Sequence, residues 1–135
     1  MFSKVLIANR GAIAVRIIRT LKKLNITSVA VYNEADKDSL HVMLADESYS
    51  LGEGPVSQTY LDQDKIIEIA KTSKAQAIHP GYGFLSENPD FVKRLESENI
   101  VFLGPTSSQM ISFGLKHEAR AIATKRMVED AEKLG

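Results

Sequence analysis

The residues best suited to chemistry lie in one glycine-containing segment, which reads His79-Pro-Gly-Tyr-Gly-Phe-Leu-Ser-Glu-Asn88. Gly81 and Gly83 can adopt backbone conformations that other residues avoid, which lets main-chain N–H groups approach an anion closely. A helix predicted to begin after this segment would add a partial positive charge at its amino end. The pattern is typical of an anion-binding loop, although a purely structural loop can have the same composition.

Two further side chains could serve a metal or a nucleotide, but each also has an ordinary interpretation. His79 has no His, Asp or Glu nearby at metal-ligand spacing, so it is interpreted as a packed or loop histidine. Lys116 follows Gly114-Leu115 at the start of a helical pattern. A lysine there is most often a solvated side chain. The alternative is a mobile ammonium group that reaches nucleotide phosphates.

The first predicted strand runs into Asn9-Arg10-Gly11 and then into a helix. In doubly wound sheets, ligands bind beyond the carboxyl ends of the strands, so this turn lies where a ligand could touch it. It lacks the three-glycine dinucleotide motif, and a turn with one glycine is usually structural. Arg16 and Arg19 lie near the edge of the apolar face of the following helix, where most arginines are simply solvated.

No Ser-His-Asp set, carboxylate pair or metal-ligand spacing stands out, so no catalytic residue and no metal ligand is predicted within these 135 residues. Seventeen basic and seventeen acidic residues balance, which excludes a global field that favours nucleic acid or an anionic membrane. There is no cysteine, and no segment approaches membrane-spanning length. We therefore expect a soluble, cytoplasmic protein with no nucleic-acid or membrane partner.

Elements able to position these residues alternate along the chain. Short apolar runs predict strands at Lys4–Ala8, Ser28–Tyr32, Ser48–Leu51, Ala75–His79 and Ile100–Leu103. Helical spacing of apolar residues predicts helices between them, the later two capped by Asp62 and by Asn88-Pro89. This alternation predicts an α/β fold with a parallel five-stranded sheet, helices on both faces and Lys4–Ala8 at the centre. We divide the chain into this domain, residues 1–114, and a helical extension, residues 115–135.

Several segments also carry a family resemblance: Lys4–Gly11, Ser28–Tyr32, His41–Asp46, Tyr60-Leu61, Ala77–Asn88 and Phe102–Pro105. They resemble biotin carboxylase, a subunit or domain of acetyl-CoA, propionyl-CoA, pyruvate and urea carboxylases. The resemblance implies a Rossmann-like domain that precedes an ATP-grasp module. It also implies a ligase that carboxylates biotin with bicarbonate, using ATP and Mg²⁺.

The resemblance assigns roles by position. Lys116 matches a lysine that contacts ATP phosphates, while Gly81, Gly83 and Glu87 match the segment that faces the active-site cleft. Arg16 and Arg19 match positions near the subunit interface of dimeric members. The implied partners are the ATP-grasp and C-terminal domains, a biotinylated carrier domain and, in the complete enzyme, a second copy.

Some positions depart from the family. Ala12 stands where most members have Glu, and Lys23 where some have an interface Glu. Gly-Leu-Lys-His at 114–117 resembles the urea carboxylase branch. The glycine-rich lid, the Mg²⁺ ligands and the bicarbonate-binding arginine lie downstream in the family. We therefore expect these 135 residues alone to be inactive and to bind no cofactor tightly.

Three alternatives follow from the same pattern. The chain could be a non-catalytic assembly module, in which Arg16 and Arg19 dock a separately encoded ATP-grasp chain. An NAD-binding Rossmann domain is disfavoured because Gly-x-Gly-x-x-Gly is missing. A response regulator is disfavoured because Asn9-Arg10 stands where acidic residues would follow the first strand.

Overall fold

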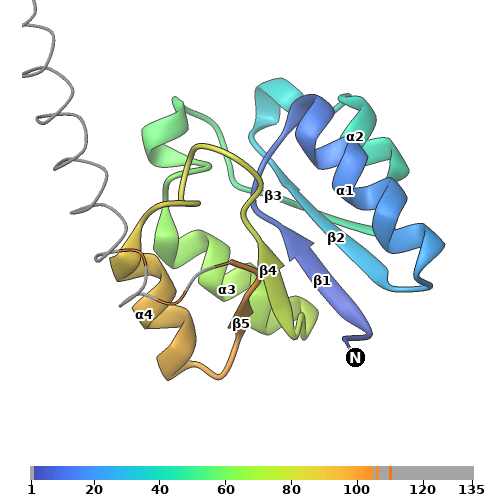
Figure 1. Ribbon diagram of the computed structural model, residues 1–135. Helices are drawn as coiled ribbons and strands as arrows, with labels where there is room; N and C mark the ends of the chain where they lie inside the picture. Colours follow the sequence, from blue (N-terminus) through green and yellow to red (C-terminus); the bar gives the residue numbers. More distant parts are fainter. Residues whose placement is uncertain (1, 105, 107–109, 111–135) are drawn as a thin grey trace, which may run out of the picture.

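A single parallel sheet forms the centre of the molecule, in a computed structural model that describes residues 2–104, 106 and 110. Its strands are β1 (Lys4–Ile7), β2 (Thr27–Tyr32), β3 (Glu47–Ser50), β4 (Ala77–His79) and β5 (Val101–Phe102). The strand order is β3-β2-β1-β4-β5, and every neighbouring pair is parallel (Figure 1). The predicted α/β class and central first strand are therefore confirmed, and each predicted strand overlaps an observed one, with ends that differ by one or two residues.

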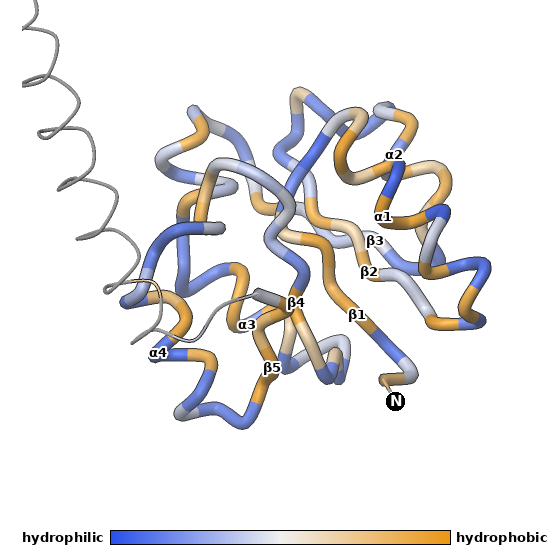
Figure 2. The backbone as a smooth tube through the Cα atoms, viewed as in Figure 1, coloured by the Kyte–Doolittle hydropathy of each residue, from blue (hydrophilic) through white to orange (hydrophobic). Residues whose placement is uncertain are grey.

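Strand β1 is central because it is apolar on both of its faces. Val5 and Ile7 belong to one hydrophobic cluster, and Leu6 belongs to the other. All three are essentially inaccessible to solvent. Figure 2 shows β1 as hydrophobic along most of its length, as expected for a strand that helices cover on both sides.

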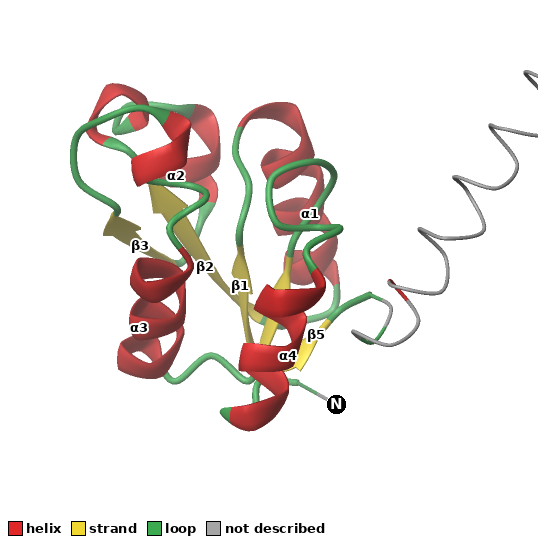
Figure 3. Cartoon of the chain, turned by 90° about the vertical axis from the view of Figure 1, so that its left-hand side faces the viewer, coloured by secondary structure: helices red, strands yellow, loops and turns green. Residues whose placement is uncertain are grey.

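Among the described residues, four α-helices cover the two faces of this sheet. Helices α1 (Gly11–Lys23) and α2 (Leu40–Leu44) lie on one side, and α3 (Gln63–Ser73) and α4 (Pro89–Ser97) on the other. In Figure 3, α3 and α4 lie nearest the viewer and α1 lies behind the strands. Short 3₁₀ turns, η1 (Glu34–Asp36) and η2 (Val56–Gln58), complete the connections.

The predicted helix caps are present. The Asp62 side chain accepts a hydrogen bond from the Lys65 N–H, and the Asn88 side chain accepts one from the Phe91 N–H. Each bond satisfies a main-chain donor that has no partner within the first turn of its helix. These caps fix where α3 and α4 begin, and α4 thereby starts directly after the glycine-containing segment.

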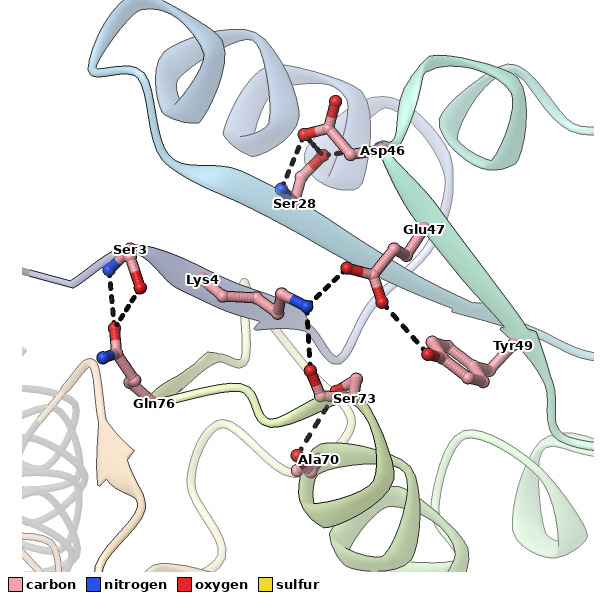
Figure 4. A network of polar contacts seen from close by, with 9 residues as sticks. All are labelled: Ser3, Lys4, Ser28, Asp46, Glu47, Tyr49, Ala70, Ser73 and Gln76. Atoms are coloured by element: carbon pink, nitrogen blue, oxygen red, sulfur yellow. Dashed lines mark hydrogen bonds and ion pairs between the residues drawn. The ribbon is translucent and has the colours of Figure 1, made fainter.

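At the amino edge of the sheet, polar side chains join the strand beginnings to one another (Figure 4). Lys4 Nζ lies 2.6 Å from Glu47 Oε2 and donates to the Ser73 carbonyl at 2.9 Å. The Tyr49 hydroxyl donates to the other Glu47 oxygen at 3.0 Å. The Lys4 hydrogen bond is the main cause that holds the pKa of Glu47 below its ordinary value, with Tyr49 acting in the same direction.

Two further pairs of residues form hydrogen bonds at the same edge of the sheet. The Ser3 N–H and hydroxyl both donate to Gln76 Oε1, at 2.6 and 3.1 Å. The Ser28 N–H donates to Asp46 at 2.9 Å, and the Asp46 N–H donates back to the Ser28 hydroxyl at 3.1 Å. These residues are far apart in sequence, so the network fixes the relative positions of neighbouring strands.

The predicted helical extension 115–135 and its Lys116 lie outside the described residues. Within the part that the structure describes, no helix is long and apolar enough to cross a membrane.

Candidate functional site

At the carboxyl edge of the sheet, the turn after β1 holds the loop after β4. Asn9 Nδ2 donates to the carbonyl oxygens of Pro80 and Tyr82, at 2.8 and 2.7 Å. Its Oδ1 accepts from the Arg10 N–H at 2.8 Å. Asn9 is only 3% exposed, so this amide is a buried group whose hydrogen-bonding capacity is used within the fold. It therefore fixes the path of the loop after β4.

Gly81 lies where this loop comes closest to α1. Its φ is +64°, and a Cβ there would lie 2.7 Å from Asn9 Nδ2 and 2.8 Å from Ile13 Cγ2. Both the backbone angle and the space therefore require glycine. The Gly81 N–H donates to His79 Nδ1 at 3.1 Å, so that nitrogen acts as an acceptor and the ring carries its proton on Nε2.

Burial lowers the pKa of His79, which favours the neutral ring that this hydrogen bond needs. The geometry agrees with a packed loop histidine. Among the described residues, no group of three or more His, Asp or Glu side chains is placed to hold a metal ion.

The outer part of the loop turns away from the protein. Gly83 has a φ of +70°, but a Cβ at that position would meet no atom within 4 Å. Phe84 also has a positive φ, +46°. Tyr82 is 76% exposed, and Glu87 is exposed as well. The loop thus combines an inner glycine that is tightly packed with an outer glycine and two side chains that are open to a ligand or another domain.

Beside the loop, Arg10 is held by a carboxylate and two aromatic rings. Arg10 Nη1 lies 3.1 Å from Asp36 Oδ2, and the Tyr60 hydroxyl donates to the same oxygen at 2.7 Å. The guanidinium carbon lies 5.3 Å from the Tyr60 ring centroid and 5.8 Å from that of Phe84. The two rings stack with centroids 5.3 Å apart. This arrangement combines an ion pair with cation–π contacts.

The titrating groups of this cluster influence one another. Burial alone would raise the pKa of Asp36, but hydrogen bonds from Tyr60 and Arg10 outweigh it and hold that pKa below its usual value. Burial and the hydrogen bond to Asp36 together raise the pKa of Tyr60 strongly. Asp36 is therefore ionised and Tyr60 neutral at physiological pH, which keeps the Arg10 side chain in place.

Sequence reasoning missed this cluster. Arg10 stood out only as part of a turn, and no spacing linked it to Asp36, Tyr60 and Phe84, which come from η1 and from the loops after η2 and β4. The position of Arg10 directly after the central strand was the one usable signal, because such residues lie at the carboxyl edge of the sheet.

Both predicted interface arginines line grooves beside α1, and Arg16 lines two of them. A groove of about 840 Å³ is lined by His79, Gly81 and Tyr82 together with Ile13 and Arg16. Arg19 lines a second groove, of about 730 Å³, between α1 and α2, and Arg16 borders it too. The structure therefore brings Arg16 and Gly81 to one groove, whose lining does not include Gly83, Glu87 or Arg19.

Known proteins give this geometry a context. Residues 1–110 match the family described as "Biotin carboxylase, N-terminal domain". The chain is 57% identical over 120 residues to mouse methylcrotonoyl-CoA carboxylase subunit alpha, covering 89% of this chain and 17% of that protein. Against the crystal structure of Kluyveromyces lactis urea carboxylase, the identity is 58% and the TM-score 0.85, covering 92% of this chain and 11% of that one.

A third relative is described with ligands. The Hydrogenobacter thermophilus 2-oxoglutarate carboxylase biotin carboxylase domain, a dimer in complex with MgADP, ADP and bicarbonate, matches with a TM-score of 0.79 and 48% identity. The match covers 82% of this chain and 24% of that one. The present chain thus spans about a quarter or less of each of these relatives. The fold, the loop after β4 and the family match agree, and the chain belongs to the biotin carboxylase N-terminal domain family.

Proposed function

We propose that this chain works as the N-terminal domain of an ATP-dependent biotin carboxylase, in which it forms one wall of the active site. The observation that carries the proposal is the loop after β4, which buried Asn9 holds at the carboxyl edge and whose Tyr82, Gly83 and Glu87 are exposed. In parallel α/β sheets, ligands bind at this edge. The complete enzyme would carboxylate biotin with bicarbonate.

The roles of individual residues follow from position. Gly81 and Glu87 would face the cleft, with Gly81 shaping the loop and Gly83 leaving room for close approach. Lys116 would contact ATP phosphates as a mobile positive charge. Arg16 and Arg19 would face an interface within the assembly, because both are exposed on α1.

Cofactors and partners belong to the complete protein. ATP, Mg²⁺ and biotin would bind there, since the relative from Hydrogenobacter is described with MgADP and bicarbonate. The described residues offer a glycine loop for an anion but no acidic cluster for Mg²⁺, so the metal would be held by other parts of the protein. Those parts are the ATP-grasp and C-terminal domains. A biotinylated carrier domain, and a second copy in a cytoplasmic homodimer, would be further partners.

The proposed function does not extend to the molecule that finally accepts the carboxyl group. The residues at 114–117 resemble the urea carboxylase branch, but identities of 57% to a methylcrotonoyl-CoA carboxylase and 58% to a urea carboxylase are nearly equal. The proposed function is therefore the biotin carboxylation step, which these carboxylases have in common.

Steady-state kinetics of a complete carboxylase that carries this domain test the proposal. Lys116→Gln should raise the apparent KM for ATP by about tenfold or more, because a charge-assisted phosphate contact is lost. Lys93→Gln is the matched control, since Lys93 is exposed on α4. An unchanged KM for ATP in Lys116→Gln would remove Lys116 from the site.

The isolated 135 residues provide a second test. Phosphoryl transfer needs metal bridging of the phosphates and positioned cations, so we expect no bicarbonate-dependent release of phosphate from ATP. Turnover above that of a Lys116→Ala variant would mean that the catalytic groups lie within this chain, and the proposal would be wrong.

A further inference from the structure

The loop after β4 contains a residue whose backbone conformation is unusual for its type. Phe84 has a φ of +46°, in the left-handed region that bulky residues avoid. It directly follows Gly83, whose φ of +70° is also left-handed. The Ser86 N–H donates to the Gly83 carbonyl at 2.9 Å, so Phe84 lies inside a tight turn. A glycine would adopt this conformation without strain, so contacts of the Phe84 side chain must hold the backbone there.

The Phe84 ring packs on a buried aromatic partner. It stacks on the ring of Tyr60, with the two ring planes inclined by only 10°. Tyr60 is fully buried and belongs to the larger of the two hydrophobic clusters. The Arg10 guanidinium lies over both rings, and cation–π contacts of this kind add to the stacking. The strained turn is therefore held on the core through the Phe84 ring, and Arg10 covers that contact.

Arg10 is itself fixed by hydrogen bonds around Asp36. Besides pairing with Arg10, Asp36 Oδ2 accepts a hydrogen bond from the Tyr60 hydroxyl. The Asn33 N–H donates to that hydroxyl at 3.3 Å, and Asn33 Oδ1 accepts from the Asp36 N–H at 3.0 Å. These bonds join η1 and the residue after β2 to Tyr60. Arg10 therefore connects a hydrogen-bonded network of the fold to the Phe84 ring.

Two consecutive residues of the turn after β1 thus hold the loop after β4 at two points. Asn9 donates to the Tyr82 carbonyl, and Arg10 contacts the Phe84 ring. Gly83 lies between these points, beside the exposed side chain of Tyr82. A loop that is fixed in advance need not be ordered when a ligand binds, and such ordering would otherwise reduce the affinity. The contacts of Asn9 and Arg10 therefore suit a preorganised binding loop.

We propose that Arg10 is a positioning residue for the biotin carboxylation step, which keeps Phe84 on Tyr60 and so fixes the loop after β4 without touching the substrate. The inference rests on the proposed function, because it gives that loop a part in binding. A purely structural role for Arg10 predicts a different kinetic result. Loss of stability lowers the fraction of folded enzyme and hence the apparent kcat, whereas loss of order in a binding loop raises KM.

NMR spectroscopy of the 135-residue chain tests whether Arg10 holds Phe84. Nuclear Overhauser effects should connect the Phe84 and Tyr60 ring protons in the unmodified chain, because the ring centroids are 5.3 Å apart. Arg10→Ala should lose these effects, since the strained turn is then free to relax. Arg10→Lys is the second variant, in case Arg10→Ala loses the fold. It keeps a positive charge beside Asp36 but lacks the planar face that covers two rings, so the effects should still weaken.

Arg94→Ala is the matched control. The Arg94 side chain is 39% exposed, against 41% for Arg10, and it also pairs with a carboxylate, that of Asp64 on α3. Its loss removes the same charge and a similar ion pair away from the loop, so the ring contacts should stay. Ring contacts that persist in both Arg10 variants would overturn the proposal, whatever the activity of the enzyme.

Steady-state kinetics of a complete carboxylase that carries this domain test what the contact does. The assay uses free biotin and measures kcat and the apparent KM for ATP, for bicarbonate and for biotin. Arg10→Ala should raise at least one of the three KM values by about tenfold and change kcat by less than about threefold. Arg94→Ala should change neither. Three unchanged KM values in Arg10→Ala, or a fall in kcat alone, would overturn the proposal.

A double-mutant cycle tests whether Arg10 acts through Phe84. Phe84→Leu removes the ring and should raise the same KM about as much as Arg10→Ala does. The double variant should differ from either single variant by no more than about twofold, because both substitutions remove one contact. Effects that multiply, to about a hundredfold in all, would mean that Arg10 acts independently of Phe84 and would overturn the proposal.

Lys116→Gln in the same assay separates this inference from the proposed function. A raised KM for ATP in Lys116→Gln, together with unaffected Arg10 variants, would remove Arg10 from the reaction and leave the proposed function standing.

Discussion

The amino edge and the carboxyl edge of the sheet use the same kinds of polar group in different ways. At the amino edge, Lys4 forms an ion pair with Glu47 and donates a hydrogen bond to the Ser73 carbonyl, and each contact connects two parts of the scaffold. At the carboxyl edge, buried Asn9 holds a loop whose outer residues, Tyr82 and Gly83 among them, remain exposed.

The polar groups of the amino edge thus serve the scaffold, whereas those of the carboxyl edge hold a loop that is open to a ligand. An ion pair between partly exposed side chains, such as Lys4 and Glu47, stabilises little, so this pair of the amino edge can be replaced at low cost. A buried amide that holds a glycine loop costs more to replace, because its loss leaves one buried and one partly buried carbonyl group without their donor. We therefore expect substitutions at the carboxyl edge to affect the fold more than those at the amino edge.

The largest effect should come from the strand that both edges share. Ile7→Ala removes a fully buried side chain from β1 and should lower the free energy of unfolding by about 2–5 kcal/mol. Chemical denaturation measures this loss. Leu24→Ala, at a position 51% exposed, should change it by only about 0.5 kcal/mol or less. Similar losses in the two variants would contradict a core centred on β1.

The next largest loss of stability is expected from substitutions at the two loop glycines. Comparing them distinguishes the cost of backbone strain from the cost of a steric clash. Gly81→Ala should destabilise the fold by about 2–4 kcal/mol, since it combines a positive φ with a clash against Asn9 and Ile13. Gly83→Ala has the same strain without the clash and should cost about 1 kcal/mol. Thermal unfolding of both variants measures the difference, and equal losses would mean that the loop can move away from α1.

The next largest loss of stability is expected from replacing the Asn9 amide. Asn9→Ala leaves the carbonyl groups of Pro80 and Tyr82 without their donor and should cost about 1–3 kcal/mol. Asn9→Asp should cost more at neutral pH, because a carboxylate would face two carbonyl oxygens. It should recover stability as the pH falls, because a protonated carboxyl group can donate again. Denaturant midpoints measured across pH test this, and a pH-independent difference from the unmodified chain would exclude the proposed contact.

The smallest loss of stability is expected from a substitution at the amino edge of the sheet. The pKa of Glu47 is lower in the folded chain than its ordinary 4.5, so the Lys4–Glu47 contact stabilises the fold above that value. This contribution disappears as the pH falls through the lowered pKa. Glu47→Gln should cost about 0–1 kcal/mol at neutral pH and nothing in strong acid. Unfolding measured against pH tests it, and a loss comparable to that of Asn9→Ala would break the contrast between the edges.

Local patterns accounted for much of the fold. The strand positions follow from short apolar runs, and the starts of α3 and α4 follow from Asp62 and Asn88, because a cap needs only residues within one helical turn. The glycine loop was identified as a candidate site from its composition. Its inner and outer glycines looked alike in sequence, however, and only their surroundings distinguish Gly81 from Gly83.

The amino-acid sequence by itself determined the alternation of strands and helices, the central position of β1 and the membership of the biotin carboxylase N-terminal domain family. Only the tertiary structure decided that Asn9 holds the loop after β4 and that Arg10 meets Asp36, Tyr60 and Phe84. The physical reason is the separation along the sequence over which each kind of interaction acts. Periodicity and capping act between residues a few positions apart, whereas these contacts join residues 26 to 74 positions apart and depend on how the strands align.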